Sequence, residues 1–361
     1  MERASIRVYL TVVYNIKVAI VKINLKSLSK EGLETFFRES RLPAFRAKQL
    51  IHWIYEKRAL SISDITEFSK ELREDLSEKA YISNLGILAR QISADGTEKF
   101  LFGLEDGEMI ESVLIPDDDR LTLCISSQVG CAMGCSFCLT ARLGLRRNLM
   151  THEIVDQVLS VGRLAAPRRI TNIVFMGMGE PLANFDAVVE ALWRLTGFLK
   201  ISPRRITLST AGIVPKILEL PKRAPRVNLA VSLNATSDSV RSRIMPLNRT
   251  YSLKELLDAC RKFPLQPRRK ITFEYVMLRD VNDRPEDARR LVILLRGVPS
   301  KVNLIPFNPY EGSEFLRPEE KTVLEFQEIL LKGNLTALIR KSKGGDISAA
   351  CGQLKAAYVR S

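Results

Sequence analysis

The spacing of hydrophobic residues changes character along the first third of the chain. Residues 28–79 place apolar side chains on broad faces with basic residues between them, which predicts a run of short helices. Ser69 stands where it would cap one of these helices. Residues 86–115 alternate instead, and Asp95-Gly96 and Asp106-Gly107 are strong hairpin-turn signals. The pattern predicts a small helical module followed by a β-meander.

The middle of the chain has a different rhythm, in which short apolar runs alternate with amphipathic stretches long enough for a helix. Alternating strands and helices imply an α/β fold with a parallel sheet and right-handed crossovers. The number of units suits a partial (β/α)6 barrel as well as an open doubly wound sheet, and periodicity does not separate the two. The six predicted strands are Leu121–Ser126, Ile170–Met176, Arg205–Ala211, Val227–Ala235, Lys270–Leu278 and Lys301–Phe307.

A last helix over Pro318–Lys332 and a basic, strand-like piece around Leu335–Arg340 precede a tail with glycines and small residues. We therefore expect five parts. They are an N-terminal extension (1–21), the helical module (22–84), the β-meander as a connecting region (85–116), the α/β barrel (117–340) and the C-terminal tail (341–361).

The charge of the chain is unusual, because 55 basic residues face 41 acidic ones and leave a net charge of +14. Such a surplus favours a polyanionic partner, either nucleic acid or an anionic membrane, over a merely basic surface. No stretch approaches the roughly 20 apolar residues that span a bilayer. Arg7, Asn15 and Lys17 interrupt the apolar N-terminus, which argues against a signal peptide and favours the cytosol.

Cysteines are the second unusual feature. Four of the six, Cys124, Cys131, Cys135 and Cys138, lie within fifteen positions, and in the cytosol such clusters bind metals or catalyse reactions. The last three have the spacing C-x3-C-x2-C, which lets three thiolates hold three irons of a cubane cluster and leaves the fourth iron open. The alternative is a structural zinc with Cys124 as its fourth ligand. With two histidines in the chain, His-rich zinc sites and His-based triads are disfavoured.

Several motifs carry a resemblance to a known family. C-x3-C-x2-C is the signature of radical S-adenosylmethionine (SAM) enzymes, and Met176–Pro181 looks like their glycine-rich loop for the methionyl amino group. A more specific set occurs in order: Ser126–Cys131 (SSQVGC), Gly177–Leu182 (GMGEPL), Leu208–Gly212 (LSTAG) and Ala349–Leu354 (AACGQL). This set resembles the RlmN/Cfr family of radical SAM RNA adenosine methyltransferases over residues 22–354.

The resemblance implies a chemistry and a set of roles. One SAM methylates Cys351, and a second SAM, bound with a 4Fe-4S cluster on Cys131, Cys135 and Cys138, yields a radical that activates this methyl group. The methylene radical then attacks a carbon of adenine, and Cys124 resolves the protein–RNA link by forming a disulfide with Cys351. Glu111 matches a position assigned as proton acceptor, although a cysteine remains an alternative for that step.

Contacts to SAM are also implied by the resemblance. They fall on Gly179, Glu180, Ser209, Ser232, Asn234 and Asn308. Many family members have histidine where this chain has Asn234, so any role that needs an imidazole there is in doubt. Cys260 matches no motif and, on an apolar helical face, is expected in the core.

The family expectation for the substrate is C2 of an adenosine in 23S rRNA and in tRNA, with C8 methylation of 23S rRNA as the alternative. Flavodoxin as electron donor, a monomeric state and no membrane association are expected. Two other classes remain open: an activase that makes a glycyl radical, and a non-catalytic RNA-binding protein with a structural zinc. Candidate RNA contacts are Arg46, Lys48, Lys57, Arg58, Arg142, Arg146, Arg147, Arg204 and Arg205.

Overall fold

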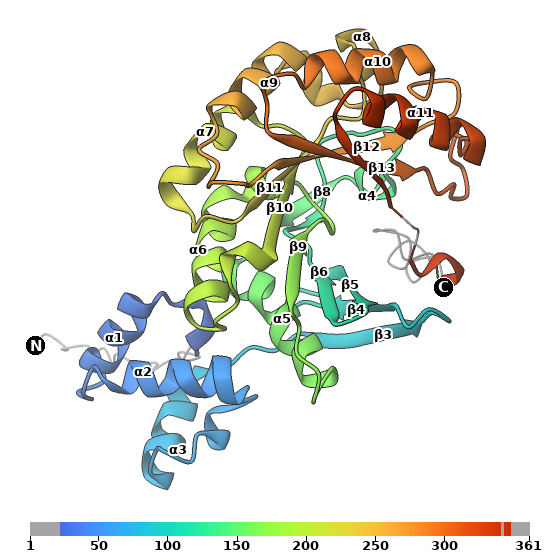
Figure 1. Ribbon diagram of the computed structural model, residues 1–361. Helices are drawn as coiled ribbons and strands as arrows, with labels where there is room; N and C mark the ends of the chain where they lie inside the picture. The colour runs from blue at the N-terminus through green and yellow to red at the C-terminus, as the bar shows by residue number, and fades with distance from the viewer. Residues whose placement is uncertain (1–21, 341–342, 348–361) are drawn as a thin grey trace, which may run out of the picture.

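The computed structural model describes residues 22–340 and 343–347, so the N-terminal extension and Cys351 lie outside the described residues. Its main feature is one ten-stranded sheet in the order β14-β13-β12-β11-β10-β9-β6-β5-β4-β3 (Figure 1). Two small two-stranded sheets, β1-β2 and β7-β8, accompany it. The meander and the α/β region thus share a single large sheet, and the helical module has the separate sheet β1-β2.

Seven neighbouring strands of this sheet are parallel. They include all six strands that the apolar runs predict, and the basic piece near residue 336 adds the seventh at the outer edge. An apolar run marks a buried strand but not its partner, which is why the place of this last strand was not predictable. The bounds are β6 Arg120–Cys124, β9 Asn172–Phe175, β10 Ile206–Thr210, β11 Asn228–Ser232, β12 Ile271–Met277, β13 Ser300–Pro306 and β14 Thr336–Ile339.

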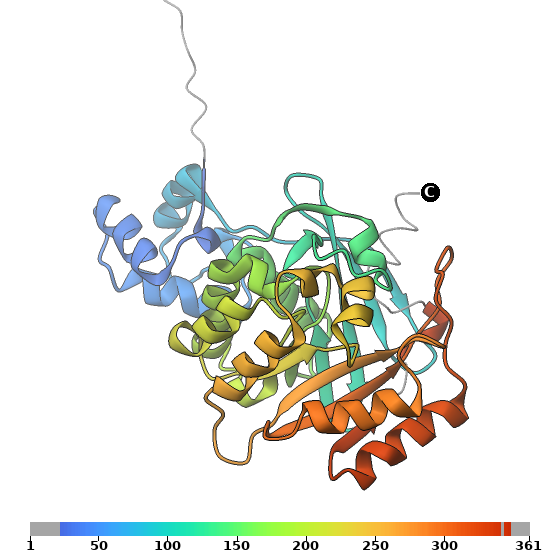
Figure 2. The ribbon, with the colours of Figure 1, turned by 90° about the horizontal axis from the view of Figure 1, so that it is seen from above.

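Helices follow most of the parallel strands and lie on the outer side of the curved sheet (Figures 1 and 2). The end strands β14 and β3 do not pair with each other, so the sheet stays open. The α/β fold class is confirmed as a partial barrel with helices on one side. The helices are α5 Thr151–Leu164, α6 Phe185–Gly197, α7 Val214–Arg223, α8 Asp238–Ile244, α9 Leu253–Lys262, α10 Pro285–Leu294 and α11 Glu320–Lys332. Among the described helices, none is both long enough and apolar enough to cross a membrane.

The β-meander continues the same sheet beyond β6. Its strands β3 (Gly86–Ile92), β4 (Glu98–Gly103) and β5 (Met109–Asp117) are antiparallel and joined at the two Asp-Gly turns. The register aligns Lys99, Val113 and Cys124 across β4, β5 and β6. Because directly opposite residues point to the same face, these three side chains share one side of the sheet.

The N-terminal module consists of α1 (Lys30–Glu39), α2 (Arg46–Ile51), the π-helical turn η2 (His52–Lys57) and α3 (Lys70–Lys79). Ser69 caps α3 as predicted, because its side chain accepts the Leu72 N–H at 3.2 Å. One continuous cluster of buried hydrophobic residues extends from this module through the barrel to β14. The module and the barrel therefore share a core.

A buried polar network also joins the module to the barrel. Lys26 donates to Asp156 of α5 at 2.8 Å and to the carbonyl of Ser83 at 2.6 Å, and both charged side chains are at most 2% exposed. Arg194 of α6 donates to the carbonyls of Lys26 and Leu28 at 2.6 and 2.9 Å. Buried donors and acceptors that are all paired across an interface hold it in one orientation.

Candidate functional site

The cysteine loop follows the first barrel strand, as the motif spacing predicts. It runs from the short strand β7 (Gln128–Gly130) to helix α4 (Leu139–Arg142), and β8 (Leu145–Asn148) returns to pair with β7. The Cys131 N–H donates to the carbonyl of Gly144 at 3.0 Å, and the Ser136 N–H donates to the carbonyl of Ile244 at 3.0 Å. These two backbone hydrogen bonds fix the first residue of the cysteine loop and its later part.

All three loop cysteines line one open cavity of about 180 Å3 at the carboxyl ends of the barrel strands. Active sites of β/α barrels lie at this end, where loops after several strands converge. Five of the six SAM contacts implied by the sequence line the same cavity: Gly179, Glu180, Ser209, Ser232 and Asn234. The structure therefore brings together residues more than a hundred positions apart that the motifs had singled out.

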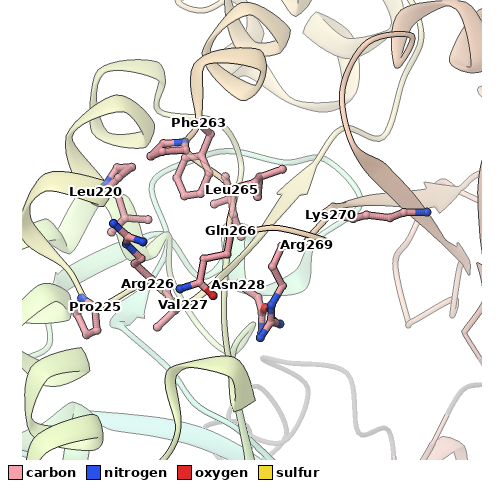
Figure 3. Close-up of a pocket in the computed structure, with 13 residues that line it drawn as sticks. Leu220, Pro225, Arg226, Val227, Asn228, Phe263, Leu265, Gln266, Arg269 and Lys270 are labelled. Atoms are coloured by element: carbon pink, nitrogen blue, oxygen red, sulfur yellow. Dashed lines mark hydrogen bonds between the residues drawn. The ribbon is translucent and has the colours of Figure 1, made fainter.

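A second, smaller hollow of about 80 Å3 lies at the opposite ends of β11 and β12 (Figure 3). Apolar side chains and the basic residues Arg226, Arg269 and Lys270 line it. None of the predicted site residues that the structure describes reaches it. The barrel's chemistry-bearing residues are therefore gathered at one end.

The thiols are strongly influenced by burial. Desolvation raises the pKa of Cys131 to about 12 and also raises the pKa of Cys135, with neighbouring thiolates and Glu180 adding to the effect. Without a cation these thiols stay protonated, whereas a bound metal centre would deprotonate them. The donor set is three soft sulfurs, and no histidine lines the cavity, which fits an iron–sulfur cluster.

The arrangement does not favour the zinc alternative. A structural zinc needs a fourth protein ligand beside the three loop thiolates. Cys124, the fourth ligand proposed for zinc, does not line the cavity.

The glycines of the Met176–Pro181 turn are required by the protein's own backbone. A Cβ atom on Gly177 would lie 2.6 Å from the carbonyl oxygen of Ile125, and one on Gly179 would lie 2.5 Å from Cβ of Gln128. Gly179 also has a φ of +102°, which other residues rarely adopt. We expected glycine here for close approach to SAM. The structure shows that the turn must also pack tightly against the segment before the cysteine loop.

Glu180 is fully enclosed, and its carboxylate accepts hydrogen bonds from the N–H of Ala211, the hydroxyl of Thr210 and the N–H of Leu182 at 2.7 to 3.0 Å. Burial raises the pKa of Glu180, and the three donors oppose this shift. The carboxylate therefore connects the turn after β9 to the end of β10 while facing the cavity.

Glu274 is a cavity residue that the sequence reasoning missed. It lies in the middle of β12, and its carboxylate accepts the hydroxyl of Ser209 at 2.7 Å. A charged residue inside the apolar run Ile271–Met277 was the available signal. Such a residue is costly to bury unless it is paired or serves a ligand.

The side chain of Asn234 lies at the wall of the cavity. Its φ is +58°, a left-handed conformation in which asparagine is enriched. The side-chain amide accepts the N–H of Val276 at 2.8 Å and donates to the sulfur of Met245 at 3.2 Å. The Asn234 amide thus joins the ends of β11 and β12 at the cavity wall by a hydrogen bond, and this bond does not require a group that changes its protonation state.

Asn308 does not line the cavity and stands exposed after β13, where it accepts a hydrogen bond from Arg317 at 2.9 Å. Its role as a SAM contact stays a prediction. Cys124 ends β6 on the face shared with Lys99. Glu111 lies two residues from Val113 on the same strand and face, and its carboxylate forms a fully buried ion pair with Lys99 at 3.1 Å.

The described part of the tail is attached to the β-meander. The Asp346 carboxylate accepts the hydroxyl of Ser93 and, at 3.0 Å, the N–H of Ala94. In return, Asp95 accepts the N–H of Gly344 at 3.0 Å. These hydrogen bonds lower the pKa of both carboxyl groups, so both are charged at neutral pH. Cys351 follows this attachment by five residues.

Four of the candidate RNA-binding cations have structural partners. Arg147 makes a two-pronged ion pair with Glu153 and contacts Asp106, and Arg58 donates to the carbonyl of Gly162 between the module and α5. Arg46 donates to the side chain of Gln49 at 2.9 Å, and Arg142 donates to the carbonyl of Gly312 at 2.7 Å. Sequence does not show what lies opposite a cation. The exposed members of the set are Lys48, Lys57, Arg142, Arg146, Arg204 and Arg205.

Comparison with known proteins places this geometry in a family. Residues 125–292 match the radical SAM superfamily, and residues 23–82 match the N-terminal domain of ribosomal RNA large subunit methyltransferases. The chain is 54% identical over 336 residues to the dual-specificity RNA methyltransferase RlmN of Pelobacter propionicus, with 92% of this chain and 96% of that protein covered. The chain belongs to the RlmN family of radical SAM RNA methyltransferases.

Other relatives agree. The dual-specificity RNA methyltransferase RlmN of Geobacter sulfurreducens is 55% identical, with 92% of each chain covered. The crystal structure of a radical SAM methyltransferase from Sphaerobacter thermophilus is 43% identical and superposes with a TM-score of 0.88 over 92% of this chain and 98% of that one. The chain is therefore a SAM-dependent RNA methyltransferase that uses a 4Fe-4S cluster, and these RlmN relatives do not favour the C8 alternative.

Proposed function

We propose that this enzyme methylates C2 of an adenosine in 23S rRNA and in tRNA, in two stages that pass the methyl group through Cys351. Membership of the RlmN family carries this proposal, together with the cavity that gathers the three loop thiols with Glu180 and Ser209. The RlmN relatives are dual-specificity RNA methyltransferases, which supports two RNA substrates. A cytoplasmic location and a monomeric state complete the proposal.

Cys131, Cys135 and Cys138 hold the cluster, and the cavity beside them holds SAM. When bound, these groups supply the methyl group and a 5′-deoxyadenosyl radical. Glu180 faces the cavity with a carboxylate, which suits the ammonium of a methionyl group. The hydroxyls of Ser209 and Ser232 and the amide of Asn234 orient the remaining polar groups of the ligand. Asn308, which follows β13 outside the cavity lining, is proposed as a further contact.

Cys351 accepts the methyl group on its sulfur and later releases the product when Cys124 attacks it to form a disulfide. The tail attachment supports this pairing. Asp95, in the turn that holds the tail, lies four residues from Lys99 along the chain and two strands from Cys124, which amounts to about 17 Å at 3.4 Å per residue and 4.8 Å per strand. Five residues beyond Asp346 also span about 17 Å, so Cys351 can reach Cys124.

Glu111 is the proton acceptor in this proposal. The adenine ring must lose the hydrogen of the substituted carbon to regain aromaticity, and a carboxylate is a suitable base. Lys99, at 3.1 Å, is fully buried with it, so the pair shields both charges from the surrounding apolar face. Because Glu111 and Cys124 share this face, the base and the resolving thiol approach the ring from the same side.

Residues 22–84 form the RNA-binding module, 85–116 connect it to the barrel at 117–340, and the tail at 341–361 carries Cys351. The exposed cations named above give the grip on phosphates, which binds RNA in a salt-dependent way. The target base turns out of its stack to reach the cavity. An external donor such as flavodoxin supplies electrons.

Three cysteine variants test the proposal. Under anaerobic conditions with SAM, a reductant and unmodified 23S rRNA fragment, Cys351→Ala should show no methylated tail peptide and no methylated adenosine. Cys124→Ala should keep the methylated tail but accumulate protein cross-linked to RNA. Cys260→Ala is the matched control, because that thiol is buried in the core on α9 and should leave turnover intact. Full activity of Cys351→Ala would overturn the proposal.

A further inference from the structure

Arg241 of α8 is the largest side chain among those wholly shielded from solvent. Its guanidinium donates to the carbonyls of Leu233, Ala211 and Ser232 at 3.0, 2.7 and 3.1 Å. A fourth bond goes to the side-chain oxygen of Asn248 at 3.1 Å. All four acceptors are neutral, so these bonds satisfy the donors of the group without neutralising its charge.

Burying a charge is costly unless an opposite charge lies near it. In the part of the chain that the structure describes, no carboxylate forms an ion pair with Arg241. The Asp238 carboxylate, on the same helix, bonds to Asn248 and to the N–H of Leu253. Ala211, whose carbonyl accepts a hydrogen bond from Arg241 at 2.7 Å, lines the same cavity as Cys135.

The helix that carries Arg241 is fixed to the cysteine loop. The carbonyl of Ile244, one turn further along α8, accepts the N–H of Ser136 at 3.0 Å. Cys135 packs against the hydrophobic cluster that contains Ala211 and Ile244. Ala211 is also a direct acceptor of the Arg241 guanidinium, so the cation and the Cys135 sulfur meet the same small group of residues.

We propose that Arg241 is the buried counter-charge of the iron–sulfur cluster and raises its reduction potential. Three of its four hydrogen bonds tie the ends of β10 and β11 to α8, which positions a permanent positive charge next to the cavity that Cys135 lines. This inference rests on the cluster assignment and does not depend on which RNA is the substrate. It concerns a residue outside the cysteine motif and outside the predicted SAM contacts.

The physical reason is a balance of charges. One electron from an external low-potential reductant adds one negative charge to the cluster held by Cys131, Cys135 and Cys138, and no bond is formed or broken. A fixed cation in a dry environment stabilises the more negative state more than the oxidised one. The guanidinium keeps its proton throughout, because arginine side chains are not deprotonated in proteins near neutral pH.

Three variants separate the charge from the packing. Arg241→Gln removes the charge and keeps hydrogen-bonding groups. Arg241→Lys keeps the charge and loses the planar guanidinium with its several N–H donors. Arg243→Gln removes an exposed cation from the same helix. Each protein is reconstituted anaerobically, its iron and sulfide are quantified, and the midpoint potential is measured by redox titration with electron paramagnetic resonance. None of these readouts requires turnover.

At the wild-type midpoint, the ratio of reduced to oxidised cluster should fall at least threefold in Arg241→Gln, a shift of about 28 mV at 59 mV per tenfold. Arg243→Gln should keep the wild-type ratio, and Arg241→Lys should stay within twofold of it. A wild-type ratio in Arg241→Gln with a full cluster, or an equal fall in Arg243→Gln, overturns the proposal. If Arg241→Gln does not assemble a cluster, Arg241→Lys decides, and a threefold fall there rejects the role of charge.

Discussion

Removal of Asp156 should destabilise the contact between the N-terminal module and the barrel far more than removal of an exposed carboxylate. Lys26 and Asp156 are 1% and 2% exposed and 2.8 Å apart, and the carbonyl of Ser83 is the other acceptor of the ammonium. In Asp156→Ala the ammonium keeps one neutral acceptor. Burial already lowers the pKa of Lys26 and raises that of Asp156, so each charge depends on the other.

Two limits give the expected loss in the free energy of unfolding of Asp156→Ala. A buried ion left without its partner costs about 3–5 kcal/mol. Alternatively Lys26 loses its proton, which costs about 4 kcal/mol at pH 7.5 from an ordinary pKa of 10.4, at about 1.36 kcal/mol per unit. We therefore expect Asp156→Ala to lose about 3–4 kcal/mol. The double variant Lys26→Met/Asp156→Leu should recover to within about 1 kcal/mol of the wild type, because an apolar pair replaces the ion pair.

Urea unfolding followed by tryptophan fluorescence measures this loss, because Trp53 lies in the module and Trp193 in α6. Asp75→Ala is the matched control, since its partner Lys79 and Asp75 itself are 49% and 48% exposed, and such pairs contribute less than about 1 kcal/mol. A loss below about 1 kcal/mol in Asp156→Ala would refute the reasoning. So would a double variant as unstable as the single one.

Three further results are expected. Gly179→Ala should abolish SAM binding measured by equilibrium dialysis, because its Cβ would lie 2.5 Å from Gln128 at a φ of +102°, and retained binding would contradict this. Asp346→Ala should change the rate of tail-cysteine methylation, followed by mass spectrometry, by less than about twofold, because Asp95 still holds the Gly344 N–H and the free tether grows only from five to seven residues. A change of threefold or more would contradict this. Burial lowers the pKa of His152 to about 4, below its unfolded value near 6.5, so the stability it contributes is complete above pH 6.5 and lost toward pH 4. In urea unfolding, His152→Gln should therefore lose about 2.5 kcal/mol less than the wild type between pH 7.5 and 4.5, and parallel losses would contradict this.

The sequence predicted those parts of the fold that depend on local pattern. Apolar runs are visible without knowing their neighbours, so every barrel strand was found, and Asp95-Gly96 marked its turn. A partial barrel and a doubly wound sheet differ in whether the helices pack on one side of the sheet or on both. This depends on contacts between distant parts of the chain, which the local pattern does not show. The pairing of Lys26 with Asp156 spans 130 positions, and no local feature of either residue indicates it.

The site was predictable where a motif fixes the residue types and hidden where charge is paired at a distance. The cysteine spacing predicted three thiols at one site, and the glycine-rich turn predicted Glu180 near them. All four residues line the same cavity in the structure. Glu274 and Arg241 escaped notice, because a single charge within an apolar segment or on a short helix has many explanations in sequence. Their contacts became visible only in the structure, where Glu274 accepts the hydroxyl of Ser209 and Arg241 donates to the carbonyl of Ala211, a residue of the cavity lining.

Nucleoside analysis of the product tests the central claim most directly. The wild-type enzyme is incubated anaerobically with SAM, a reductant and unmodified 23S rRNA or tRNA, and the digested RNA is separated by liquid chromatography and identified by mass spectrometry. Methylation through Cys351 at the proposed carbon predicts 2-methyladenosine from both RNAs, and its loss in Cys351→Ala but not in Cys260→Ala. The appearance of 8-methyladenosine, or of no methylated adenosine from a protein with a full cluster, would contradict the proposed function.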